Sequence, residues 1–203
     1  MDRKMLEYSL QDTSRLAITE YRQPEIVNRM SRISQATDST FLGISADDPS
    51  RIIEFSRNGQ RIACFGEWEK VATHPNLNDA QLYRLNSGWF KGDQDLGLHV
   101  IACIFRDRLE IFDYLSKELI IVDGPSLDFP TFRVIGQNVD IPKKDNPYKY
   151  RDISITRDYI FALYGGIGEF EYRETSKLAE KIYVFTNKGE PVSILELDRS
   201  LGG

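Results

Sequence analysis

The sequence predicts an all-β fold built from repeated units, and three observations support this prediction. The chain contains 10 Tyr and 11 Phe but only 2 Trp, and most of these aromatic residues lie inside β-branched runs, which favours strands. Two such runs flank Asn58-Gly59, a dipeptide typical of β-hairpins, and we expect a two-residue type I′ turn there. The same hairpin pattern recurs along the chain. We therefore expect a repeat architecture.

Each recurring hairpin has an aromatic anchor in its first strand. The anchors are Tyr8, Phe55, Phe112 and Phe185. Repeats of roughly 40–50 residues that contain only strands indicate propeller blades, which have four strands each. A third apolar run precedes each of the last three hairpins, at residues 40–44, 98–105 and 159–164. Weaker candidates for the innermost strand come before these runs, at residues 32–36, 81–85 and 152–156.

This pattern predicts a β-propeller segment of about three and a half four-stranded blades, arranged as an open arc. We expect a single repeat domain over residues 1–203. It consists of an outer hairpin at 4–19, blades at about 26–67, 80–123 and 150–197, and the start of a further blade at 198–203. The alternative is a two-sheet sandwich whose hairpins resemble one another by accident.

The connections between strands differ in length, and the difference indicates where a ligand would bind. Most hairpin turns are short, whereas the connections at 68–79, 124–149 and 165–180 are long. In a propeller these three connections lie on the same face of the disc. Functional loops concentrate where a rigid scaffold presents them. We therefore expect the binding site on the face that carries the long connections.

Four side chains are candidates for this site. Trp68 lies in the first long connection, Trp89 follows Ser87-Gly88, and Tyr164 ends the strand before the last long connection. Arg106 lies in a short loop after an apolar strand. Together they could form a stacking and hydrogen-bonding rim for a peptide or a sugar. The alternative is that these aromatic residues pack between neighbouring blades.

The sequence nominates no catalytic residue, no metal site and no cofactor. His74 and His99 are the only histidines, and neither has a partner at metal-ligand spacing. Residues 92–97 contain two carboxylates, as calcium loops do, but a turn between strands is the better interpretation. Cys64 and Cys103 lie in apolar runs, and we expect both to pack in the core.

Charge and hydropathy limit the partners. The net charge of −5 and the pI near 5.2 argue against a nucleic-acid partner, which requires an excess of Lys and Arg. No stretch approaches the ~18 apolar residues of a membrane span. The N-terminal residues also lack the apolar region of a signal peptide.

Four segments resemble the bacterial TolB-like six-bladed propeller family, and their order along the chain follows the family pattern. They are residues 51–66, 109–114, 152–166 and 182–198. The resemblance implies a propeller fold and a cell-envelope protein, often an exported lipoprotein, but it supplies no established catalytic residues. The chain lacks an export signal and is too short for six blades, so we expect a truncated member and leave its localisation undetermined.

Two functions follow from these observations. The first is a non-catalytic binding or scaffold module that recognises a protein, peptide or glycan partner through the long-loop face. The alternative is a hydrolase- or lactonase-like enzyme with a metal or an acid/base pair in the central channel. An open arc also exposes strand edges and an apolar blade face, so we expect the isolated chain to self-associate.

Overall fold

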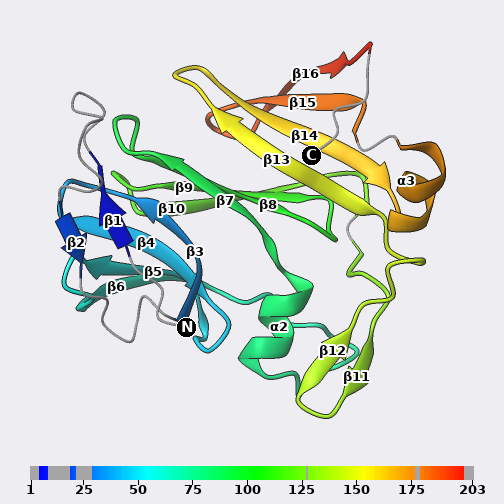
Figure 1. Ribbon diagram of the computed structural model, residues 1–203, viewed down its shortest axis with the longest axis horizontal. Coiled ribbons are helices and arrows are strands. Elements are labelled where there is room, and N and C mark those ends of the chain that lie inside the picture. The colour runs from blue at the N-terminus through cyan, green and yellow to red at the C-terminus, as the bar shows by residue number, and fades with distance from the viewer. Residues whose placement is uncertain (1–4, 9–18, 22–28, 127, 177–178, 199–203) are drawn as a thin grey trace.

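The computed structural model describes residues 5–8, 19–21, 29–126, 128–176 and 179–198. Within these residues the strands form three four-stranded antiparallel sheets and two two-stranded hairpins (Figure 1). We call the four-stranded sheets blades 1, 2 and 3. Blade 1 contains β3 (Met30–Gln35), β4 (Thr40–Ser45), β5 (Ser50–Ser56) and β6 (Arg61–Glu67); blade 2 contains β7 (Gly88–Asp93), β8 (Leu98–Cys103), β9 (Arg108–Asp113) and β10 (Glu118–Asp123); blade 3 contains β13 (Tyr148–Ile155), β14 (Tyr159–Ile167), β15 (Lys181–Thr186) and β16 (Pro191–Glu196).

The predicted all-β arc of blades is confirmed. Each sheet is a meander in which consecutive strands pair antiparallel, and the innermost strands β3, β7 and β13 are neighbours from one blade to the next. Alternate side chains of each strand face the adjacent blade. Leu42 and Ile52 of blade 1 pack with Phe90 of blade 2, and Val100 of blade 2 packs with Ile160 of blade 3. The core of the described residues therefore consists of two apolar layers between sheets and a smaller cluster on blade 1 formed by Met30, Ile53 and Phe55.

The aromatic anchors of the three blades are buried at equivalent positions. Phe55 and Phe112 are fully buried and Phe185 is 8% exposed, and each lies in the third strand of its blade. Phe112 and Phe185 face the preceding blade, whereas Phe55 packs with Met30 and Phe41 of its own blade. Tyr8 differs from them. It follows the short strand β1 (Met5–Glu7) and is 54% exposed.

The hairpin turns differ from the expected type I′ geometry. Gly59 has a positive φ of 73° but Asn58 does not, so the predicted two-residue turn is wrong. The Gly59 N–H donates to Ser56 O at 2.8 Å, and the pairing register shifts beside the turn, which is typical of a loop that ends in a glycine bulge. Gly189 ends the corresponding loop of blade 3 with a φ of 84°, and Lys117 ends that of blade 2 with a φ of 61°.

Residues 81–85 were expected as the innermost strand of blade 2, and this expectation is wrong. They lie in helix α2 (Asp79–Leu85), and β7 takes the innermost place instead. The helix begins at a capping box, in which the Asn78 side chain accepts from the Gln81 N–H and the Gln81 side chain accepts from the Asn78 N–H. Leu82 and Leu85, three positions apart, then share the buried face of the helix.

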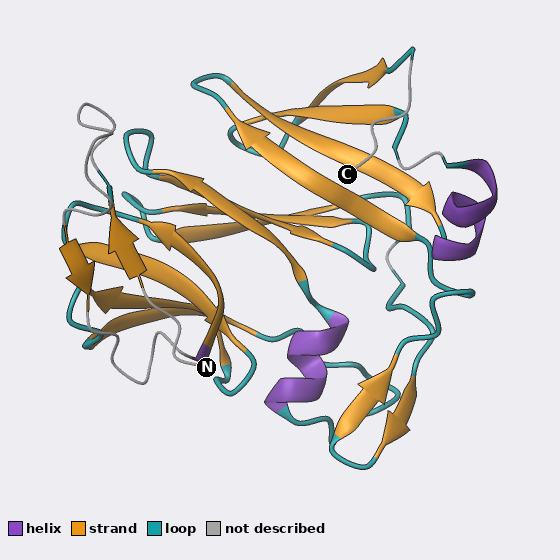
Figure 2. Cartoon of the chain, in the orientation of Figure 1, coloured by secondary structure: helices purple, strands orange, loops and turns teal. Residues whose placement is uncertain are grey.

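Three insertions gather along one side of the blade array (Figure 2). The first connects β6 to β7 and contains α2, and the second connects β10 to β13 and contains the hairpin β11 (Arg133–Ile135) and β12 (Asn138–Asp140). The third connects β14 to β15 and contains helix α3 (Glu169–Thr175). We call this side the insertion face. The arrangement follows from the meander: β6, β10 and β14 end, and β7, β13 and β15 begin, at the same end of their sheets.

The N-terminal hairpin pairs β1 with β2 (Thr19–Tyr21), so its observed second strand starts where the predicted one ends. Residues 9–18, which include most of the predicted turn and second strand, lie outside the described residues. Of the two cysteines, Cys103 is buried as expected, whereas Cys64 is exposed because it lies on the outermost strand β6. Among the described residues, no helix has both the length and the apolar character needed to cross a membrane.

Candidate binding face

A groove opens on the insertion face between the first and second insertions. Its volume is about 500 Å3, which is typical of small-ligand sites. The segment before α2 and the start of the helix form one wall, and the β11–β12 hairpin forms the other, next to which α2 packs. The groove is lined by Thr73, His74, Pro75, Asn76, Leu77, Asn78, Gln81, Val134, Gly136 and Gln137.

Side-chain amides hold the two walls together. Gln81 Nε2 donates to Gly136 O at 3.2 Å, and Asn78 Nδ2 donates to Gln137 Oε1 at 3.1 Å. The same Asn78 and Gln81 side chains cap α2, so one pair of residues fixes both the helix and the groove. The groove is therefore formed before any ligand arrives.

An aromatic pair lies at one end of the groove. The exposed His74 ring packs on Phe132 with ring centroids 4.8 Å apart, and Thr73 Oγ1 lies 3.0 Å from His74 Nδ1. This contact orients the imidazole and leaves its Nε2 without a hydrogen bond to any described residue. The pair adds an aromatic surface to a groove lined by amides and aliphatic side chains.

A charged network lies between blades 1 and 2, under the insertion face. Arg106 Nη1 donates to Glu69 Oε2 and to Asn86 Oδ1, both at 2.8 Å, and the guanidinium lies 3.9 Å from the centroid of the Phe129 ring. Arg108 also pairs with Glu69. Burial opposes ionisation of Glu69, but its hydrogen bond to Arg106 and the positive charges of Arg106 and Arg108 lower its pKa below the usual value. Arg106 is 2% exposed, so it anchors the first insertion.

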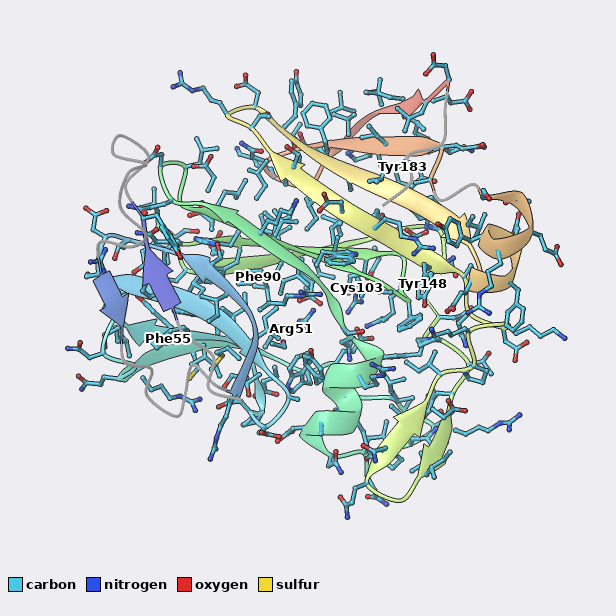
Figure 3. All side chains as sticks on the ribbon, in the orientation of Figure 1. Arg51, Phe55, Phe90, Cys103, Tyr148 and Tyr183 are labelled. Carbon is cyan, nitrogen blue, oxygen red and sulfur yellow. The ribbon has the colours of Figure 1, made fainter. Side chains whose placement is uncertain are left out.

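Trp68 is part of the same buried region. It is 3% exposed, its Nε1 donates to Asp48 O at 2.6 Å, and its ring meets Tyr83 of α2 edge-on. The Arg51 guanidinium lies 4.6 Å from the centroid of the Trp68 ring (Figure 3 shows Arg51 between the first two sheets). Trp68 therefore joins blade 1 to the first insertion.

Trp89 and Tyr164 both contact Tyr150 in the layer between blades 2 and 3. Trp89 Nε1 donates to Tyr150 O at 3.2 Å, and the Tyr150 ring packs edge-on against Tyr164, which stacks on Tyr183 at 4.6 Å. Tyr150 Oη donates to the buried Asp107 carboxylate at 3.1 Å. Burial, together with the negative charge of Asp107, raises the pKa of Tyr164 to about 12.

The structure places the four candidates from the sequence in two separate groups: Trp68 and Arg106 are buried, whereas Trp89 and Tyr164 are half-buried. Trp68 and Arg106 are connected through Asn86 and Arg51 between blades 1 and 2, whereas Trp89 and Tyr164 lie between blades 2 and 3. Trp68 and Arg106 pack against the insertions, and Trp89 and Tyr164 pack between two blades, where Tyr164 also lines a pocket beside α3. The groove lies on the long connections, as the sequence predicted for a site, but its lining residues were not among the four candidates. They include the Asn and Gln side chains of these connections.

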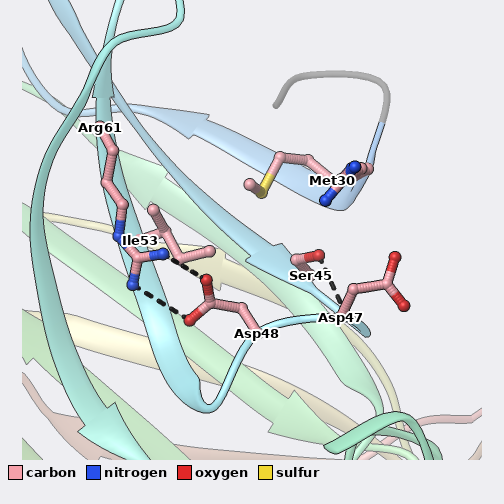
Figure 4. A pocket seen from close by; sticks show the side chains of 7 residues that line it. Met30, Ser45, Asp47, Asp48, Ile53 and Arg61 are labelled. Atoms are coloured by element: carbon pink, nitrogen blue, oxygen red, sulfur yellow. Dashed lines mark hydrogen bonds and ion pairs between the residues drawn. The ribbon is translucent and has the colours of Figure 1, made fainter. Parts of the chain in front are cut away.

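A second, smaller hollow of about 280 Å3 lies on blade 1 (Figure 4). Arg61 Nη1 donates to Asp48 Oδ2 at 2.5 Å at its edge, and Arg61 also contacts the Cys64 thiol. Burial opposes ionisation of Asp48, but hydrogen bonds from Ser50 and Arg61 lower its pKa below the usual value. The charges of Arg61 and Asp48 thus neutralise each other, which leaves little free charge to bind a ligand.

The described residues include no group of three or more His, Cys, Asp or Glu side chains placed to hold a metal ion. Residues 92–97 form the turn between β7 and β8, in which Asp93 Oδ1 accepts from the Leu96 N–H at 3.0 Å. The turn interpretation of this segment is confirmed. His99 is fully buried, with its Nδ1 3.1 Å from Ser34 Oγ.

Family comparison agrees with this architecture. The model of the family described as TolB-like 6-blade propeller-like matches residues 2–203. The chain belongs to this family. No curated protein matches the chain.

Several solved structures are similar to this TolB-like chain at low identity. A protein of unknown function from Bacteroides caccae is 12% identical, with 83% of this chain and 50% of that chain covered and a TM-score of 0.42. Hsv2 from Kluyveromyces lactis is 12% identical, with 81% and 35% covered and a TM-score of 0.37. AztD from Citrobacter koseri is 11% identical, with 85% and 48% covered and a TM-score of 0.30. The chain spans 50% of the length of the Bacteroides protein, 35% of the length of Hsv2 and 48% of the length of AztD.

Proposed function

We propose that this TolB-like chain is a non-catalytic binding module that recognises a protein, peptide or glycan partner through its insertion face. The observation that carries the proposal is the groove between the first two insertions. Its walls come from segments far apart in the sequence, yet two amide hydrogen bonds join them. A rigid blade array that presents a preformed groove is suited to recognition, because little ordering is needed when a partner binds.

The predicted site residues have a supporting place in this proposal. Trp68 and Arg106 fasten the first insertion to the blades, and Trp89 and Tyr164 fasten blade 3 to blade 2. They act by holding the insertion face in position and do not touch the partner. We also propose that the three blades and the N-terminal hairpin function as one domain over residues 1–203.

Masking one face at a time tests the proposal. In a Cys64→Ser background, Asn76→Cys places a thiol in the groove, and Gln60→Cys places one on the opposite face, in the exposed turn after β5. Each variant is coupled to a maleimide polyethylene glycol and then used to capture partners by cross-linking from an extract of the source cells. Loss of capture with the Asn76 label alone supports the proposal. Equal capture with both labels overturns it.

The enzymatic alternative is tested by metal analysis. A binding module needs no resident ion, so we expect no stoichiometric divalent metal in the purified chain. A metal retained at one ion per chain, and lost on substitution of carboxylates lining the inner strands, would contradict the non-catalytic proposal.

A further inference from the structure

The groove on the insertion face is lined by uncharged side chains. None of its ten lining residues is Asp, Glu, Lys or Arg, although 28% of the chain is charged. A charged ligand placed there would lose its hydration without gaining an opposite charge, which is unfavourable. We propose that this groove binds an uncharged saccharide. The inference rests on the proposed binding function and specifies the class of ligand.

Several residues that line the groove carry hydrogen-bonding groups without a partner among the described residues. The Asn76 amide makes no hydrogen bond to any described residue, and Gln137 uses its Oε1 for Asn78 but not its Nε2. Nε2 of His74 is also without a described partner. Amides supply donors and acceptors together, and so do sugar hydroxyls. A saccharide can therefore satisfy both kinds of group within one short ligand.

Apolar surface complements these polar groups. Pro75, Leu77 and Val134 line the groove, and Val134 is 46% exposed. The His74 ring, supported by Phe132, adds a flat face. Sugar rings present C–H groups on one side and hydroxyls around their edges, which matches a wall of small apolar groups beside amides.

An extended peptide fits the site less well. A peptide that adds to a sheet needs an exposed strand edge of several residues and pockets for alternate side chains. β11 and β12 are three residues each, and β12 already packs beside α2. The neutral lining also offers nothing to an acidic or basic peptide. These features favour the saccharide.

The groove is held in one shape by groups that the ligand does not need. Gln81 is 4% exposed, and its amide makes hydrogen bonds to the helix cap and to Gly136 O. Asn78 Nδ2 donates to Gln137 Oε1. Asn76 and Gln137 Nε2 can therefore be altered without breaking these links. Variants at Asn76 and Gln137 therefore test ligand binding separately from the stability of the groove.

The test uses the full chain and a panel of defined oligosaccharides. The neutral probes are maltohexaose, cellohexaose, laminarihexaose, mannohexaose, xylohexaose and chitohexaose; the charged controls are oligogalacturonate and a chitosan oligomer, and an uncharged Ser/Asn/Gly peptide is included. Binding is detected by saturation-transfer difference NMR and quantified by calorimetry. Asn76→Asp and Gln137→Glu keep the shape of each side chain while replacing its donor by a negative charge. Gln60→Glu makes the same charge change on the opposite face.

We expect at least one neutral oligosaccharide to bind the wild-type chain and the Gln60→Glu variant equally, and to bind Asn76→Asp and Gln137→Glu at least about tenfold more weakly, with unchanged thermal melts. Binding that the groove variants do not weaken would overturn the site. Preference for a charged probe or for the peptide would overturn the ligand class. If no neutral probe binds but the Asn76 label still blocks partner capture, the saccharide inference fails and the proposed function stands. Failure of both assays removes both proposals.

Discussion

Arg51 Nε lies 2.5 Å from Glu110 Oε2, and this ion pair joins β5 of blade 1 to β9 of blade 2 with side chains that are 3% and 5% exposed. Arg51 Nη2 also donates to Asn86 O at 3.0 Å, at the end of the first insertion. Burial opposes the charge of Arg51, but the nearby Glu110 carboxylate raises its pKa above the usual value, so the guanidinium stays charged. The position of the insertion face relative to the blades therefore depends on a buried pair.

We expect Arg51→Met to lower the free energy of unfolding by about 3–5 kcal/mol, because it leaves Glu110 buried without a counter-charge. The double variant Arg51→Met/Glu110→Met should recover most of this loss. Lys91→Met, which breaks a half-exposed pair with Asp152, is the control and should cost no more than about 1 kcal/mol. Urea unfolding measures all three. A double variant as unstable as Arg51→Met would show that lost packing, and not the unpaired carboxylate, is the cause.

His99 makes stability depend on pH. Burial lowers its pKa to about 4, whereas the unfolded chain has the ordinary value of 6.5. The unfolded state therefore binds one more proton between these values, so the free energy of unfolding falls as pH falls from 6.5 to about 4 and this contribution is constant below. The loss is on the order of 3 kcal/mol. It should be absent in His99→Gln and retained in His74→Gln, when unfolding is measured across this pH range. Equal pH profiles for both variants would refute the assignment to His99.

Gly92 is required because two other side chains lie too close to its backbone to leave room for a side chain. A Cβ at this position would overlap His99 Nδ1 and Ser34 Oγ, which meet there between blades 1 and 2. Because the His99 ring is fully buried, it cannot move aside. We expect Gly92→Ala to cost about 1–3 kcal/mol in thermal or urea unfolding. Gly168→Ala is the control, because its Cβ would contact only Lys143 O at 3.5 Å. A stable Gly92→Ala variant together with an unstable Gly168→Ala variant would contradict this packing.

The two thiols should differ in reactivity. Cys64 is exposed, whereas Cys103 is fully buried and burial raises its pKa to about 12. The thiolate is the reactive form, so a disulfide reagent at neutral pH should modify one cysteine per native chain and the second only after unfolding. Cys64→Ser should abolish the fast phase. Reaction of both thiols at the same rate would show that blades 1 and 2 separate in the native state.

The free side of blade 3 should make the isolated chain associate. Phe161, Leu163 and Ile182 line a hollow of about 350 Å3 there, and Leu195, which pairs with Ile182 on the outer strand, is 44% exposed. Apolar surface of this kind favours contact with further sheets. Sedimentation of the wild-type chain should show association that Leu163→Lys reduces. A wild-type chain that remains monomeric at all concentrations would contradict this prediction.

The blade pattern could be predicted because its signal is local. The strands that contain Phe55, Phe112 and Phe185 are short runs rich in β-branched and aromatic residues that end at turns, so each hairpin is visible within about 20 residues of sequence. Helix α2 was missed because Leu82-Tyr83 and Leu85 read as a short apolar run. The decisive signal was the capping pair Asn78 and Gln81, which lies at the edge of that run.

Of the proposed site, the sequence predicted only the side of the blade array. The long connections indicated where the insertions gather, but the groove depends on hydrogen bonds between residues 55 and 59 positions apart, which no local pattern reports. The burial of Trp68 and Arg106 likewise depends on residues of the insertions, such as Tyr83 and Phe129, that are distant in sequence. Both residues therefore read as exposed loop residues although both are buried.

Side-chain amide signals test most directly whether the groove between the first two insertions is the binding site. In a 15N-labelled chain titrated with the neutral oligosaccharide panel, we expect the NH2 signals of Asn76, Asn78 and Gln137 to shift together, while those of Asn58, Gln60 and Asn187 at the opposite turns stay fixed. Shifts confined to the turn residues, or no shift at Asn76 and Gln137 when a probe binds, would contradict it.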